Sequence, residues 1–134
     1  MGRVSRRACP ATLMSSKESG QTAERLARKH LEQNGLSLVA QNWRCRRGEL
    51  DLIMLDGKTL VFVEVRLRKH LGWGGALESV DMRKRGKLIL AAQQFLQNEP
   101  RWSKSPCRFD VVAFEPDKQQ DSPQLNWLKN AFDS

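Results

Sequence analysis

The chain has 134 residues, with 23 lysines and arginines against 15 aspartates and glutamates, which gives a formal net charge of +8. That length suits one domain with a real hydrophobic core, and such a charge favours a polyanionic partner, nucleic acid before a membrane surface. Three cysteines without C-x-x-C spacing argue against a disulfide framework or a zinc site. No apolar run reaches membrane-spanning length. We therefore expect a cytoplasmic protein that binds nucleic acid, with a merely basic soluble protein as the simpler alternative.

The first elements in chain order are a basic arm and a helix. Residues 1–14 hold three arginines and no acidic residue, so we predict a disordered N-terminal arm, followed by a single domain over residues 15–134. Asn34-Gly35 marks the end of the helix, and Glu24 borders its apolar stripe and should point toward a sheet edge. The stripe itself follows helical spacing and comprises Ala23, Leu26, Ala27, His30 and Leu31.

A first strand is predicted over residues 36–43, and the most hydrophobic stretch of the chain, Gly48 to Arg68, predicts a β-hairpin. Asp56-Gly57 is the turn signal, because glycine tolerates the positive φ that such turns need. In the first arm of the hairpin, alternation predicts two faces. One face carries Glu49, Asp51, Ile53 and Leu55, and the other carries Leu50, Leu52 and Met54.

Two registers of this hairpin are open. If Asp56-Gly57 alone forms the loop, Glu49 lies opposite Glu64; if the loop runs from Asp56 to Thr59, Asp51 lies opposite Glu64. A one-residue slip would move every side chain to the other face, but both of these registers gather Glu49, Asp51, Glu64 and Arg66 on one face. Crowded carboxylates require a compensating cation, so we expect a Mg²⁺ or Mn²⁺ site with oxygen ligands here.

The remaining elements supply basic residues around this hairpin. A second helix is predicted from Ser79 to Asn98, with Lys84 extending its apolar stripe. A strand follows over residues 108–114, and residues 125–132 predict a short strand and turn folded back on the core. Helix, three strands, helix and strand together predict an α/β fold, a mixed central sheet flanked by helices. The predicted nucleic-acid contacts are Arg44, Arg46, Arg47, Arg68 and Lys84.

Four motifs follow one another along the chain: Gly20-x-x-Ala23-Glu24, Gly48-Glu49-Leu50-Asp51-Leu52-Ile53, Phe62-Val63-Glu64-Val65-Arg66-x-Arg68 and Arg108-Phe109-Asp110-Val111-Val112. Together they resemble the YraN family of bacterial proteins without a settled function. That family in turn resembles restriction-endonuclease-like nucleases and archaeal Holliday junction resolvases. The resemblance implies an αβββαβ core in which the PD-(D/E)-x-K motif falls on Asp51, Glu64 and Arg66, with Glu24 as a further catalytic and metal-binding glutamate.

The resemblance also implies a Mg²⁺-dependent nuclease acting on DNA, with branched DNA as one candidate and a homodimer as the form that two-fold junctions favour. Residue 66 departs from the motif, because it is Arg where the nucleases have Lys. Arginine stays protonated and cannot act as a general base. The alternative is therefore a nucleic-acid-binding module that has lost turnover, and a third hypothesis is a protein adaptor. Lys84 is a candidate replacement for the missing lysine.

Overall fold

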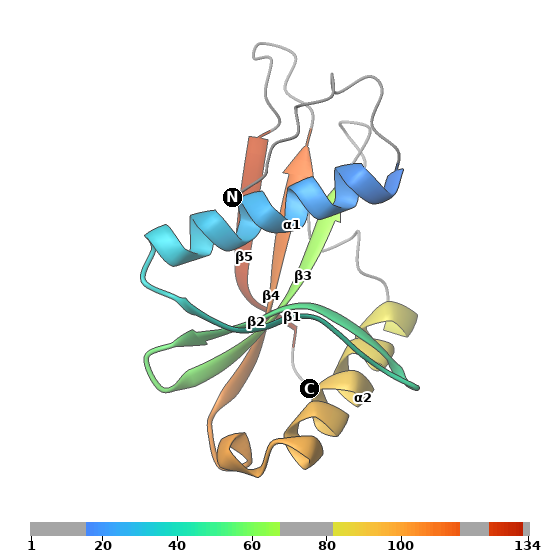
Figure 1. Cartoon of the computed structure of the whole chain (residues 1–134), viewed down its shortest axis with the longest axis vertical. Helices are drawn as coiled ribbons and strands as arrows, with labels where there is room; N and C mark the ends of the chain where they lie inside the picture. The colour runs from blue at the N-terminus through green and yellow to red at the C-terminus, as the bar shows by residue number, and fades with distance from the viewer. Residues whose placement is uncertain (1–15, 68–81, 116–123, 133–134) are drawn as a thin grey trace, which may run out of the picture.

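The computed structural model describes residues 16–67, 82–115 and 124–132, which form a mixed five-stranded sheet and two long helices (Figure 1). The predicted α/β class and the αβββαβ order are confirmed, and the C-terminal segment is a full strand instead of a short strand and turn. In order the elements are α1 (Ser16–Gln33), β1 (Ser37–Cys45), β2 (Gly48–Asp56), β3 (Thr59–Leu67), α2 (Met82–Asn98), the 3₁₀ helix η3 (Pro100–Trp102), β4 (Cys107–Glu115) and β5 (Gln124–Phe132).

The described strands lie in the order β1-β2-β3-β4-β5; among them β3 and β4 pair in parallel, and the other neighbours pair antiparallel. Antiparallel neighbours need only a short turn, whereas the parallel pair requires a crossover, in which α2 lies. The site predicted from the sequence therefore lies on β2 and β3, in the middle of the sheet.

The hairpin of β2 and β3 adopts the wider of the two predicted registers. Leu55 pairs with Leu60, the ladder continues to Asp56 and Thr59 at the turn, and Gly57 has a φ of 63°. Left-handed backbone of this kind is cheap for glycine and costly for most other residues. The register in which Asp56 and Gly57 alone form the loop is wrong.

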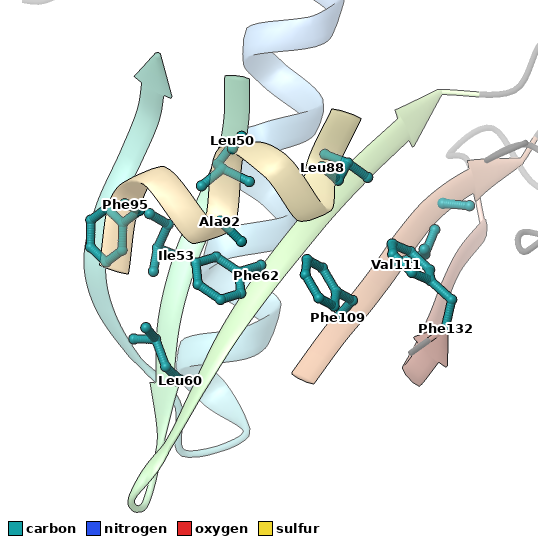
Figure 2. Packing of buried hydrophobic residues seen from close by; sticks show 12 residues of the cluster. Leu50, Ile53, Leu60, Phe62, Leu88, Ala92, Phe95, Phe109, Val111 and Phe132 are labelled. Atoms are coloured by element: carbon teal, nitrogen blue, oxygen red, sulfur yellow. The ribbon is translucent and has the colours of Figure 1, made fainter. Parts of the chain in front are cut away.

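One face of the sheet packs against α2 (Figure 2). The stripe predicted for this helix is confirmed, since its buried residues are Leu88, Ala91, Ala92 and Phe95. They meet Ile53, Leu60, Phe62, Phe109 and Val111 from the strands. Leu50 also lies in this cluster, so the prediction that it shares a face with Leu52 and Met54 is wrong. Strict alternation along β2 ends between Leu50 and Leu52.

The other face packs against α1 through Ala23, Ala27 and Leu31, which are all buried. Leu26 was predicted in this stripe, but 47% of its surface is exposed, because the band of the helix that meets the sheet is narrower than the sequence pattern suggests. His30 packs edge-on against Trp127 with ring centroids 5.9 Å apart.

A buried polar network joins β4 to β5. Asp110 is fully buried, and its carboxylate accepts hydrogen bonds from Arg108 Nε at 3.0 Å, Trp127 Nε1 at 3.0 Å and the Asn130 backbone N–H at 2.8 Å. Arg108 also reaches Asp56 at 2.9 Å. A buried carboxylate is tolerated when several donors satisfy it, so this network explains how β4 can carry a buried aspartate.

Several predictions concern parts of the chain outside the described residues. These are the basic arm over residues 1–14, the helix start at Ser79 and the nucleic-acid contact Arg68. Among the helices that are described, none combines the length and the apolar character needed to cross a lipid bilayer.

Candidate metal and nucleic-acid site

Asp51 lies where the β2–β3 ladder opens. The last paired residues are Leu52 and Val63, one step before Asp51 and Glu64. Beyond this pair, Asp51 Oδ2 accepts the backbone N–H of Val65 at 2.9 Å. The Asp51 carboxylate therefore accepts a hydrogen bond that a backbone carbonyl of β2 would accept in a continued ladder. This bond fixes Asp51 beside the motif that contains Glu64 and Arg66.

Glu64 has a buried side chain with two cationic partners. Its Oε2 lies 3.3 Å from Lys84 Nζ and 3.4 Å from a guanidinium nitrogen of Arg66, and only 5% of the glutamate side chain is exposed. Lys84 comes from the first turn of α2, twenty positions further along the chain. The structure thus brings together four predicted site residues, Asp51, Glu64, Arg66 and Lys84, from two strands and one helix.

The two carboxyl groups interact directly. Burial, the negative charge of Glu64 and a hydrogen bond shared with Glu64 raise the pKa of Asp51 to about 7, against the opposing effects of the Val65 N–H and Lys84. Like charges that are forced together and partly desolvated favour the protonated form. A pair of carboxyls that holds a proton near neutrality is also a pair that a cation would stabilise.

Glu24 of α1 lies at the margin of this pair. Burial first, and then the charge of Asp51, raise the pKa of Glu24, whereas a hydrogen bond with the side chain of Asn42 lowers it. Asn42 has a φ of 52° and sits on β1 between residues that pair with Leu50 and Leu52, so it lies opposite Asp51. Asn42 was not among the residues predicted from the sequence, where its one signal is that asparagine tolerates left-handed backbone.

We tested whether these residues suit a divalent cation. Within the described ranges, no three His, Cys, Asp or Glu side chains come close enough to form a complete cage, so Glu24 does not join Asp51 and Glu64 as a third direct neighbour. Magnesium commonly uses one or two protein carboxylates and completes its octahedron with waters and substrate phosphates. The Asp51–Glu64 pair fits that open arrangement, with Glu24 placed to act through water.

The basic residues predicted at the β1–β2 turn divide into two groups. Arg44 belongs to β1 instead of the turn, and its Nε lies 3.1 Å from an Oε of Glu49. Arg46 and Arg47 form the turn itself and are exposed. Glu49 was predicted on the carboxylate face; its side chain is 55% exposed and paired with Arg44, so it stands apart from the Asp51–Glu64 pair.

Comparison with known proteins supports the resemblance found in the motifs. Residues 23–114 match the profile of a family described as "Uncharacterised protein family UPF0102". A "UPF0102 protein" of Pseudomonas fluorescens strain Pf-5 is 66% identical over 120 residues, which is 90% of this chain and 97% of that protein. A second, from Pseudomonas aeruginosa strain LESB58, is 59% identical over 120 residues, covering 90% of this chain and 96% of the relative. The matched region contains all of the carboxylates and cations of the site.

Proposed function

The chain belongs to the uncharacterised protein family UPF0102, whose description names no activity, and we propose from the site itself that the protein is a divalent-metal-dependent nuclease. The observation that carries the proposal is the contact of Asp51 and Glu64 at the opened end of the β2–β3 ladder, with Lys84 and Arg66 beside them. Paired carboxylates next to two cations suit a reaction in which negative charge builds up on a phosphodiester.

Asp51 and Glu64 would hold the ion, which supplies Lewis acidity toward a phosphoryl oxygen and toward water. The protein contributes the rest. The Val65 N–H fixes the orientation of Asp51. Lys84 and Arg66 place positive charge within 3.4 Å of Glu64, where they can stabilise a phosphate that enters the site. An arginine cannot serve as a general base, so Arg66 orients the phosphate and Lys84 takes the role that the motif gives to its lysine.

The substrate that we propose is DNA, because the formal charge of +8 favours a polyanion and the exposed arginines lie on the same β1–β2 hairpin as Asp51. Cleavage should be assayed on duplex, single-stranded and branched DNA with Mg²⁺, Mn²⁺ or EDTA. Metal-dependent cutting that disappears in Asp51→Asn and Glu64→Gln supports the nuclease. Glu32→Gln is the matched control, since Glu32 is an exposed carboxylate on α1 that pairs with Arg28.

A second function is favoured by one specific observation. Lys84 and Arg66 both contact Glu64, so that carboxylate is already compensated by charge without a metal ion. A module that binds nucleic acid and has lost turnover would keep this arrangement. Salt-sensitive binding without cutting of any of the three DNA forms, unchanged by EDTA, would identify the binding module and exclude the nuclease.

A further inference from the structure

The β1–β2 turn carries a second site that the carboxylate pair does not use. A shallow pocket of about 400 Å³ lies between the turn and α2, and its lining includes Arg44, Arg46, Arg47 and Lys87 as well as Cys45 and Glu49. Four cationic side chains thus face one carboxylate. The composition of this lining indicates a ligand that is an anion.

The pairing of these groups strengthens that conclusion. Glu49 is engaged by Arg44 at 3.1 Å. Within the described part of the chain, Arg46, Arg47 and Lys87 form no ion pair with a carboxylate. Unpaired cations of this kind attract solvent anions, and the release of counterions drives the binding of phosphates to basic surfaces.

The pocket is also held in a fixed position relative to the carboxylates. A Cβ added to Gly48 would lie 3.4 Å from the Lys87 carbonyl oxygen, so the tip of the hairpin rests directly against α2, as Figure 1 also shows. Lys84 at the carboxylate site and Lys87 at the pocket are one helical turn apart. Along β2, the three residue-to-residue steps from Asp51 to Gly48 span roughly 10 Å.

We propose that this pocket is a phosphate subsite that holds the sugar-phosphate backbone of a nucleic acid roughly 10 Å away from Asp51 and Glu64. Arg46, Arg47 and Lys87 contact the phosphates, and Arg44 and Glu49 hold the end of β1 against β2. The position of the nucleic-acid strand relative to Asp51 and Glu64 rests on the proposed nuclease function, but binding of phosphate in the pocket needs neither metal nor turnover. Contacts of this kind read no sequence.

The first test compares two double variants in a binding assay with EDTA, using fluorescence anisotropy of a labelled DNA duplex. Arg46→Ala with Arg47→Ala removes two charges from the pocket, and Lys58→Ala with Lys104→Ala removes two from exposed sites elsewhere. For the pocket variant we expect roughly tenfold weaker binding and a salt slope that falls by about 1.8, at about 0.9 per phosphate contact. Equal losses in both variants, or no binding by the unaltered chain, overturn the subsite.

The second test uses two of the three cysteines, Cys45 and Cys107, as reporters. Cys45 lines the pocket, whereas the exposed Cys107 starts β4 beside Leu60, near the other hairpin turn. Bound duplex should slow alkylation of Cys45 and leave that of Cys107 unchanged, as followed for each peptide by mass spectrometry. Equal rates with and without DNA at Cys45 would refute the subsite. If Arg46→Ala/Arg47→Ala keeps both Mg²⁺-dependent cutting and unaltered affinity for DNA, the subsite proposal fails and the nuclease proposal stands. If DNA binds through the pocket and is not cut, the nuclease proposal fails and the subsite proposal stands.

Discussion

Val65 donates its backbone N–H to the carboxylate of Asp51 across 2.9 Å, although the two residues are 14 positions apart. The bond forms one step beyond the last paired residues of the β2–β3 ladder, Leu52 and Val63. A ladder that opened without it would leave this N–H unsatisfied inside the domain, which is costly. The end of the ladder and the position of the site carboxylate therefore have one physical cause.

Asp51→Asn should stabilise the folded protein, and more at about pH 8 than at about pH 5. Burial and Glu64 raise the pKa of Asp51 to about 7 from its ordinary value of 3.8. The stability linked to its proton is complete below the unfolded-state pKa and is lost as the pH rises through about 7, since ionised Asp51 is then held beside Glu64. Asparagine avoids that charge and still accepts the Val65 N–H.

At about pH 8, Asp51→Asn should raise the free energy of unfolding by about 2 kcal/mol. This is less than the free energy that corresponds to the whole pKa shift, because solvent reaches part of the side chain. Urea unfolding at both pH values measures it. Glu32→Gln, which alters an exposed carboxylate, should show the same small difference at both. A stability difference between Asp51→Asn and the unaltered protein that does not vary with pH would contradict the raised pKa.

Addition of Mn²⁺ should raise the thermal unfolding temperature, and EDTA should reverse the change. An ion that binds the folded state alone stabilises it by about 1.4 kcal/mol at ten times its dissociation constant. The effect should vanish in Asp51→Asn and in Glu64→Gln, because each removes one of two carboxylates, and persist in Glu32→Gln. Mn²⁺ stabilisation that survives loss of both site carboxylates would place the ion elsewhere.

Lys84→Met should abolish most cleavage per folded molecule. The Lys84 ammonium is 3.3 Å from Glu64, and 41% of its side chain is exposed, so its aliphatic stem can be replaced with little loss of packing. Removal of one preorganised charge from a reacting site costs roughly 10²-fold in turnover. Steady-state cleavage of labelled DNA, with circular dichroism as the folding control, measures the loss. Lys58→Met, at the β2–β3 turn, should keep full activity; similar rates for the two variants would remove Lys84 from the mechanism.

Local patterns predicted what local geometry determines. The turn at Gly57, the stripe of α2 and the shared face of Asp51 and Glu64 depend on residues within one or two elements, and all three are observed. Arg66 beside Glu64 followed from the two-residue period of β3 in the same way.

The features that the sequence did not predict depend on packing between distant segments. Leu50 packs in the hydrophobic cluster with α2 instead of lying on the face predicted for it. It is close to the tip of the β1–β2 hairpin, where Gly48 lies against the helix. Asn42 of β1 makes a side-chain hydrogen bond with Glu24 of α1. Arg108 reaches Asp56 across 52 positions. No periodicity in a single segment carries information of this kind, because each contact exists only after the sheet is assembled.

Arg108→Ala should destabilise the protein severely without altering the chemistry of the site. The variant removes two side-chain donors from the fully buried Asp110 and leaves its charge with Trp127 and the Asn130 N–H. Loss of one partner from a buried ion pair costs about 3–5 kcal/mol, and equilibrium urea unfolding would measure it.

Arg101→Ala breaks an exposed pair with Glu99 at 3.8 Å and should cost less than about 1 kcal/mol. If Arg108→Ala is equally mild, the network does not anchor β4 to β5. Cleavage per folded molecule should match that of the unaltered protein, because Arg108 and Asp110 contact none of the four residues at the carboxylate site.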